Sequence, residues 1–188
     1  MKALFISGSP KTNGSTASVI LETARALRDG GIETSIICLG ETEIHYCLGC
    51  KKCYDAGKCI QSDDMNTIIA AIFASDLIII ASPSYWGDIT GQMKVFIDRC
   101  TPFCNTNPNR IPVPAGKKGA AIAIRAGMSK IENEHLIATI EHFLGHLDVP
   151  LLFQYSAEGI ECVQDLEKRR EVLKSAYLFG KSISESVF

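Results

Sequence analysis

The sequence lacks a long hydrophobic run and an excess of charge of either sign. Its apolar runs reach about six residues, far below the ~20 needed to span a bilayer, and residues 1–8 lack the apolar stretch of a secretory signal. The formal net charge of -2 provides no broad cationic face of the kind that a non-specific nucleic-acid binder requires. We therefore expect a soluble, cytoplasmic protein that binds neither membrane nor nucleic acid.

The chain does contain enough apolar sequence for a globular core. Hydrophobic residues make up 46% and charged residues 21% of 188, which is typical of a folded protein and argues against disorder. This length suits one domain over residues 1–188.

Short apolar runs that indicate buried strands alternate with segments that indicate amphipathic helices. The strands are expected at 2–7, 32–38, 76–81, 119–124 and 149–155, and the helices at 15–29, after Asp63-Asp64, at 90–101, around 136–147 and at about 163–186. Residues 40–62 show no regular period, and residues 102–118 hold four of the seven prolines, which indicates a stiff, irregular connection. This alternation predicts an α/β fold, a doubly wound five-stranded parallel sheet. Ligands of such sheets bind at the carboxyl edge, where the loops 8–16, 82–89 and 125–129 are expected.

The loop after the first strand is rich in groups that bind phosphate. Its candidate ligands are Ser9, Lys11, Asn13, Ser15 and Thr16, next to backbone N–H groups at the start of a helix. It is neither a Walker A loop nor a GxGxxG fingerprint. One cation among many uncharged donors suits a single phosphomonoester. The alternative is an ordinary capped turn.

The loop after the third strand carries the chain's single tryptophan. Its candidate residues are Pro83, Ser84, Tyr85, Trp86 and Gly87, and aromatic side chains beside Gly and Pro can flank a flat ring. The alternative is an aromatic patch that closes the core or a subunit interface. Combined with a phosphate loop at the same edge, this loop favours FMN as the cofactor.

Cysteine is abundant, and four of the eight cysteines form one compact motif. Cys47, Cys50, Cys53 and Cys59 show the spacing of a metal site. Three thiolates at intervals of three favour a [4Fe-4S] cluster, because a cluster spreads its ligands over several iron atoms. Free redox-active thiols and a zinc site remain open. The other four, Cys38, Cys100, Cys104 and Cys162, are expected to be small buried hydrophobic residues.

These motifs, GSPKTNGST, CLGCKKCYDAGKC and SPSYWGDITGQMKVFIDR, resemble the flavodoxin-like NAD(P)H-dependent FMN reductase family, and the cysteine spacing is similar to that of its iron–sulfur flavoproteins. The resemblance implies the strand order 2-1-3-4-5 and FMN at the carboxyl edge. It implies phosphate binding by Ser9, Lys11, Ser15 and Thr16, and ring binding by residues 83–87. It places a third flavin loop at 125–128, with Ala126 and Gly127 as its candidate ligands. It also implies a homodimer or homotetramer.

We therefore expect a flavin oxidoreductase in which FMN carries the chemistry and no side chain acts as catalytic acid or nucleophile. NAD(P)H is the expected transient substrate, with a small molecule or a protein as the other electron donor or acceptor. A non-enzymatic flavodoxin-like electron carrier and a thiol-based redox sensor are the alternatives. His135, His142 and His146 share one helix and are expected at its solvent face or in an oligomer contact.

Overall fold

A computed structural model describes residues 1–187 of the chain. Its five strands are β1 (Lys2–Ser7), β2 (Glu33–Cys38), β3 (Leu77–Pro83), β4 (Lys118–Ile124) and β5 (Leu151–Ala157). All four neighbouring pairs are parallel, and the order is β2-β1-β3-β4-β5. The predicted fold class and strand order are confirmed, and they are those of the flavodoxin-like, doubly wound sheets.

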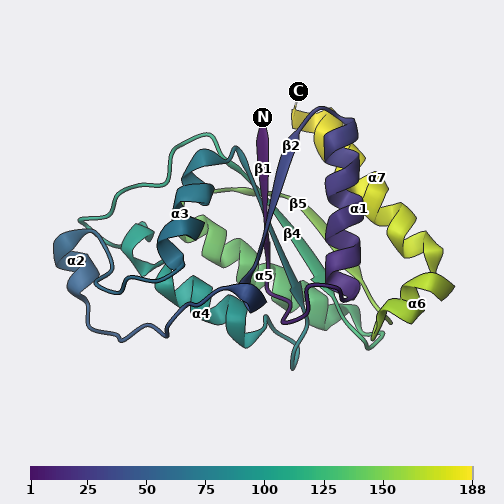
Figure 1. Cartoon of the computed structure of the whole chain (residues 1–188), viewed down its shortest axis with the longest axis horizontal. Coiled ribbons are helices and arrows are strands. Elements are labelled where there is room, and N and C mark those ends of the chain that lie inside the picture. The colour runs from purple at the N-terminus through teal and green to yellow at the C-terminus, as the bar shows by residue number, and fades with distance from the viewer. Residues whose placement is uncertain (188) are drawn as a thin grey trace.

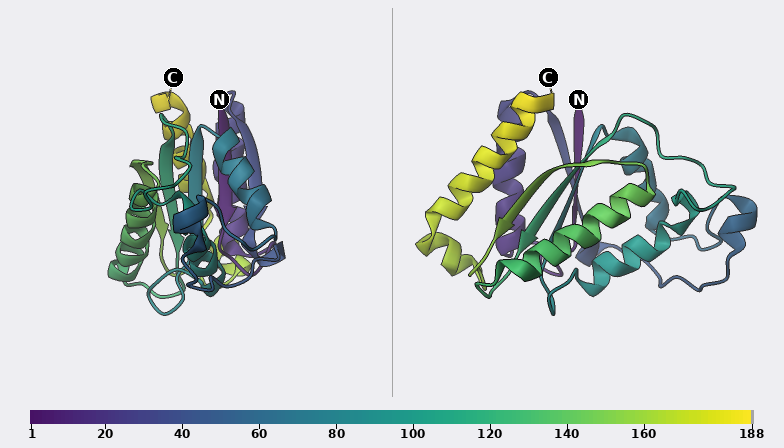
Figure 2. Two further views of the ribbon diagram at one scale, coloured as in Figure 1. Left: turned by 90° about the vertical axis from the view of Figure 1, so that its left-hand side faces the viewer. Right: turned by 180° about the vertical axis from the view of Figure 1, so that it is seen from behind.

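Helices cover both faces of this sheet (Figures 1 and 2). The helices are α1 (Ser15–Asp29), α2 (Lys52–Ala56), α3 (Met65–Ala74), α4 (Gly91–Arg99), α5 (Lys130–His146), α6 (Val163–Lys168) and α7 (Arg170–Val187), with 3-10 turns η1 (Leu39–Glu41) and η2 (Thr101–Phe103). α1 and α7 lie side by side on one face, while α3, α4 and α5 cover the other.

The core consists of two hydrophobic clusters, one on each side of the sheet. Successive side chains of a strand point to opposite faces. Leu4 and Ile6 of β1 therefore pack against α3, α4 and α5, whereas Phe5 packs against α1 and α7. β3 is covered on both faces, which explains its unbroken apolar sequence.

One expectation about a helix was wrong, and one segment without a regular period contains a short helix. The helix predicted over 163–186 is two helices, because Arg169 leaves the helical conformation (φ -116°, ψ 60°) and donates from Nη1 to the Glu158 carbonyl at 2.5 Å. Residues 40–62 contain the short helix α2, bounded by Lys51 (φ 56°) and Gly57 (φ 67°), both left-handed. A five-residue helix is too short for a periodic pattern to reveal.

The expected burial of the scattered cysteines is also wrong for three of four. Cys100 is buried, but Cys38 and Cys104 are half-buried and Cys162 is exposed. Cys38 ends the edge strand β2, and Cys162 precedes the short surface helix α6. Within residues 1–187, no helix combines the length and apolar character needed to cross a membrane.

Candidate functional site

The carboxyl edge of the sheet lies at the bottom of Figure 1. The three loops expected there border one cavity of about 140 Å³. Its lining residues come from four segments: Ser9, Lys11, Gly14, Ser15 and Thr16; Pro83, Ser84 and Tyr85; Ile124, Arg125 and Ala126; and Ile160 and Glu161. Four of the predicted cofactor residues do not line it, namely Asn13, Trp86, Gly87 and Gly127. The structure thus brings most of the predicted site together.

The first loop presents an open helix terminus to this cavity. No side chain caps α1 at Gly14, so the first-turn N–H groups face the loop without a side-chain acceptor. The Ser15 hydroxyl is buried and has no hydrogen-bond partner among the described residues. A buried donor without a partner is rare in folded proteins. A phosphate oxygen at this terminus would accept from the hydroxyl and from the helix N–H groups.

Ser9 has a different role from its loop neighbours. Its Oγ accepts a hydrogen bond from the Lys11 backbone N–H at 3.1 Å and donates to the Lys11 carbonyl at 3.0 Å. The Ser9 hydroxyl therefore shapes the turn that carries Lys11, whose side chain is exposed at the cavity.

Thr90, which sequence reasoning missed, connects the loop after β1 (residues 8–16) to α4 through hydrogen bonds. Its Oγ1 donates to the Gly8 carbonyl at 2.6 Å and accepts from the Met93 N–H at 3.2 Å, so one hydroxyl holds the loop and caps the helix. The Thr90 N–H donates in turn to Ser82 Oγ at 3.3 Å. A Cβ at Gly8 would lie 3.0 Å from Met93 and 3.1 Å from Thr90, which is tighter than ordinary van der Waals contact, so glycine favours this close approach.

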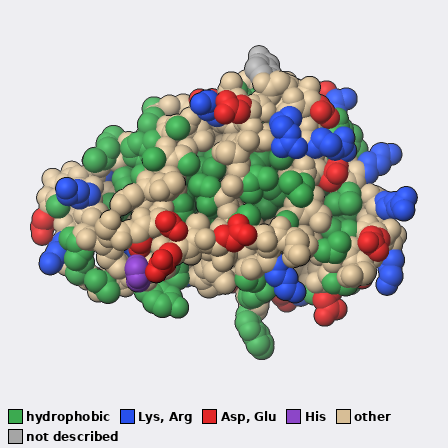
Figure 3. Space-filling view, viewed as in Figure 1, with side chains coloured by type: hydrophobic (Ala, Val, Ile, Leu, Met, Phe, Trp, Pro, Cys, Tyr) green, Lys and Arg blue, Asp and Glu red, His purple; other side chains and the backbone are tan. Residues whose placement is uncertain are grey.

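The second loop is a tight turn that projects from the carboxyl edge. Tyr85 and Asp88 exchange backbone hydrogen bonds of 2.9 and 3.2 Å, and both residues between them have positive φ (Trp86 56°, Gly87 80°). This is the geometry of a type I′ turn. Trp86 at the tip is 105% exposed, and hydrophobic atoms project from this edge in Figure 3. Tyr85, rather than Trp86, borders the cavity.

The third loop contributes a second cation, Arg125, which the sequence analysis placed in this loop but did not name as a ligand. Its side chain is 14% exposed, pairs with Glu132 at 2.6 Å, and leaves Nε buried without a partner among the described residues. A Cβ at Gly127 would collide with this guanidinium, so Gly127 makes room for Arg125 instead of lining the cavity. The signal was present in the sequence, because Arg125 directly follows the fourth strand.

The four clustered cysteines line a second, smaller cavity of about 30 Å³. Cys47 and Cys50 are exposed, and Cys53 and Cys59 are half-buried. Burial raises the pKa of the Cys53 thiol, and negative charge on the other three adds to that effect. No three His, Cys, Asp or Glu side chains within residues 1–187 are grouped so as to hold a single metal ion. Four thiols border this one cavity, and thiolates are ligands of both zinc and iron–sulfur sites.

A buried ion pair lies next to the cysteine segment, residues 47–59. Arg99, at the end of α4, binds Asp63 through Nη1–Oδ2 at 2.6 Å and Nη2–Oδ1 at 3.1 Å, with both side chains 2% exposed or less. Burial acts to raise the pKa of Asp63, but hydrogen bonds from Arg99 and from the backbone of His45 and Met65 hold it well below its usual range. Asp63 also accepts from the Met65 N–H at 3.2 Å and so begins α3, as expected, whereas Asp64 binds the Glu43 N–H instead.

The proline-rich connection packs against the same segment. Asn107 donates to the Cys53 carbonyl at 3.1 Å, and Asn109 donates to the Tyr54 carbonyl at 2.6 Å. Residues 102–118 therefore support the short helix that carries Cys53.

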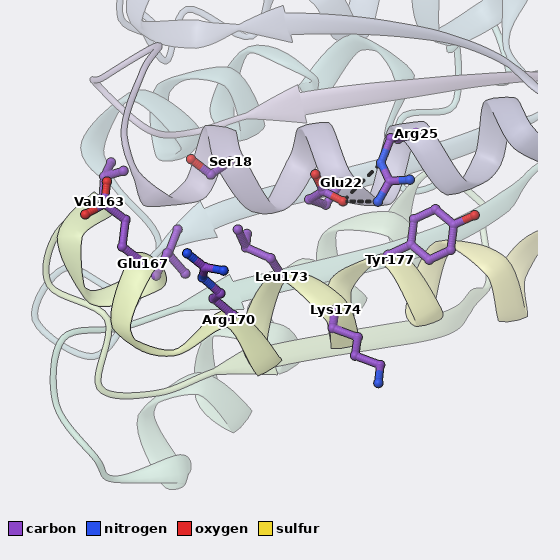
Figure 4. A pocket seen from close by; sticks show the side chains of 10 residues that line it. Ser18, Glu22, Arg25, Val163, Glu167, Arg170, Leu173, Lys174 and Tyr177 are labelled. Atoms are coloured by element: carbon purple, nitrogen blue, oxygen red, sulfur yellow. Dashed lines mark hydrogen bonds and ion pairs between the residues drawn. The ribbon is translucent and has the colours of Figure 1, made fainter.

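A larger cavity of about 460 Å³ lies between α1 and the pair α6 and α7 (Figure 4). It shares no lining residue with the cavity at the three loops. Arg25 in its wall is bound to Glu22 at 2.6 Å and stacks 4.2 Å from the centre of the Tyr177 ring. Because none of the three loops at the carboxyl edge contributes to it, this cavity is not part of the candidate cofactor site.

The strand order and the helices on both faces of the sheet define a flavodoxin-like α/β protein. Residues 1–157 match the profile of the NADPH-dependent FMN reductase family, and the chain belongs to that family. It is therefore a flavin oxidoreductase.

Two relatives and one solved structure are similar to this chain. An iron-sulfur flavoprotein of Archaeoglobus fulgidus is 36% identical over 70% of this chain and 58% of its own length. An iron-sulfur flavoprotein of Methanocaldococcus jannaschii is 31% identical over 100% of this chain and 97% of its own. The solved structure of an NAD(P)H:quinone oxidoreductase from Methanothermobacter marburgensis superposes with a TM-score of 0.79 over 97% of this chain and 96% of that one, at 14% identity, which shows a shared fold.

Proposed function

We propose that this chain binds FMN at the carboxyl edge of its sheet, takes electrons from NAD(P)H, and exchanges them with a [4Fe-4S] cluster held by its cysteine segment. The observation that carries the flavin site is the buried, unpartnered Ser15 hydroxyl at an uncapped helix terminus, in a cavity that all three loops share. The family membership and the names of the two archaeal relatives support the redox assignment.

The phosphate of FMN is assigned to the start of α1. Ser15, Thr16 and the first-turn N–H groups would donate to it, and Lys11 would balance part of its charge, with Arg125 nearby in its pair with Glu132. The cavity of 140 Å³ is smaller than the ~300 Å³ or more of sites for drug-sized ligands, so it suits the phosphate end of the cofactor. Pro83, Ser84, Tyr85 and Ala126 border the rest of the molecule. When bound, FMN supplies redox chemistry in steps of one or two electrons.

The cysteine segment is assigned to the cluster. Cys47, Cys50, Cys53 and Cys59 provide four thiolates, and Lys51 beside them offsets part of their negative charge. When bound, the cluster supplies single-electron transfer. A chain with both groups connects a two-electron donor such as a nicotinamide to one-electron partners. The chain's own residues need only bind, orient and balance charge.

An anaerobic purification tests this assignment. We expect released flavin to chromatograph as FMN, and about four iron and four sulfide per chain after reconstitution. Cys47→Ala should lose the cluster and keep FMN, whereas the matched control Cys162→Ala, an exposed cysteine outside the cavity, should lose neither. Recovery of FAD, or failure to bind FMN, would refute the flavin assignment. Failure to reconstitute with iron and sulfide would refute the cluster.

Stopped-flow mixing with NADH and NADPH separates an enzyme from a carrier. We expect one of them to bleach the bound flavin. If neither does while dithionite does, the chain is an electron carrier. We also propose a homodimer or homotetramer, which sedimentation of the FMN-bound protein tests. Phe96 is fully buried in the chain's own core and would contribute nothing to such an interface.

A further inference from the structure

Arg99 is among the largest fully buried side chains of the protein, and it lies where the cysteine segment begins and ends. Its Nη1 donates to the His45 carbonyl at 2.8 Å, and its two Nη atoms hold the Asp63 carboxylate. His45 and Asp63 flank the segment that contains all four clustered cysteines. One guanidinium therefore ties together the two ends of a long irregular segment.

The third nitrogen of this guanidinium has no such partner. Arg99 Nε is buried without a hydrogen bond among the described residues, and Arg99 lines the cavity of the four cysteines. Arg99 and Cys59 both line this cavity of about 30 Å³, so the guanidinium and that thiol border the same small space. Lys51, the other cation in the cavity wall, is exposed. Arg99 is thus the buried positive charge beside the thiols.

We propose that Arg99 is the positioning residue of the cluster site: its Nη fork on Asp63 and His45 closes the cysteine segment, and its Nε–H and charge face the sulfur ligands. This inference rests on the proposed cluster function. A guanidinium suits both roles, because it presents several donors in a fixed plane and stays charged when buried. A lysine would keep the charge and lose the fork, and a glutamine would lose both.

The test compares Arg99→Lys, Arg99→Gln and the control Arg110→Gln in the full-length, anaerobically reconstituted protein. Arg110 is a fair control, because it also pairs with a carboxylate, Asp148 at 2.5 Å, but does not line the cysteine cavity. FMN content reports whether each variant has folded. Iron retention against a chelator and the midpoint potential of the cluster report on the site.

We expect Arg99→Gln to weaken iron retention by about 10–100-fold, as is usual for residues that support metal ligands, and to lower the midpoint potential because a nearby positive charge is lost. Arg99→Lys should weaken retention less and keep the potential near that of the wild type. Equal iron retention in Arg99→Gln and Arg110→Gln would overturn the closing role, and an unchanged potential in Arg99→Gln would overturn the facing role.

Two further measurements distinguish failure of the role of Arg99 from failure of the protein to fold or to take up a cluster. If Arg99→Gln binds no FMN, it has not folded, and Arg99→Lys then provides the test. Iron retention equal to that of the wild type in Arg99→Lys would refute the role of the two Nη atoms in closing the cysteine segment. If the wild type itself takes up no cluster, the iron-free proteins are compared by alkylation of Cys53 and Cys59. Faster alkylation in Arg99→Gln than in Arg110→Gln would still support closure of the segment, and equal rates would refute it.

Discussion

Removing the Ser15 hydroxyl should weaken FMN binding without weakening the fold. The hydroxyl is buried and unpartnered in the described chain, so Ser15→Ala removes a polar group that the protein itself does not satisfy. Ala is also the better helix former at this first position of α1. The free energy of unfolding of the FMN-free protein should therefore stay equal or rise slightly.

The expected loss of affinity follows from the bond that the hydroxyl would make to a charged phosphate. Such a bond contributes about 1.5–3 kcal/mol, which corresponds to a Kd raised by about 10- to 150-fold. Riboflavin lacks the phosphate, so its Kd should not change. Fluorescence quenching of each flavin by the FMN-free protein measures both constants.

Ser18→Ala is the matched control, one turn further along the same helix. Its hydroxyl donates to the Gly14 carbonyl at 3.3 Å and does not line the cavity of the three loops. We expect it to leave the Kd of FMN within about twofold, a difference of ~0.4 kcal/mol. If Ser15→Ala weakened FMN and riboflavin equally, or if Ser18→Ala weakened FMN as much as Ser15→Ala, the phosphate assignment would be refuted.

Three other predictions concern single side chains. Thr90→Val should lower the free energy of unfolding by about 1–2 kcal/mol, because the variant loses both the helix cap and the hydrogen bond to the Gly8 carbonyl. Urea unfolding measures this change. A decrease below ~0.5 kcal/mol would contradict the dual role of the Thr90 hydroxyl. The pKa of Asp63 is lower in the folded than in the unfolded protein, so the stability that its ionised form contributes is fully present above about pH 4 and is lost as the pH falls through the folded value. Unfolding of Asp63→Asn should therefore depend less on pH below 4 than that of the wild type, and parallel curves would count against the pair. Burial raises the pKa of the Cys100 thiol strongly, so iodoacetamide at pH 8 should label Cys162 and spare Cys100, which peptide mass spectrometry would show.

Much of the architecture was predictable because it depends on patterns that repeat along the chain. Unbroken apolar runs such as residues 77–81 occur in strands that are covered on both faces, and β3 contains this one. The order of the strands came from the family resemblance. The break at Arg169 was not predictable from periodicity, because it depends on a carbonyl at Glu158 that only the fold brings within reach.

The candidate cofactor residues were predictable where the chain presents its backbone directly to the carboxyl edge. Ser15 and Thr16 lie at the start of a helix that follows a strand, and that order alone places them near an anion site. The exposure of Trp86 was not predictable, because the sequence could not reveal the left-handed turn that carries its side chain into solvent.

The sequence by itself determined the alternating elements, the phosphate-type loop and the spacing of the four cysteines, because each depends on residues close together in the chain. The tertiary structure alone decided how those parts are held. Thr90 reaches Gly8, and Arg99 reaches Asp63, across 82 and 36 residues respectively. Such pairs leave no periodic pattern in the sequence, because the hydrogen-bond partner of a hydroxyl or guanidinium depends on distance and burial in the folded chain. The sheet and α4 bring these groups together. As a result, Thr90 holds the loop after β1, and Arg99 holds the cysteine segment.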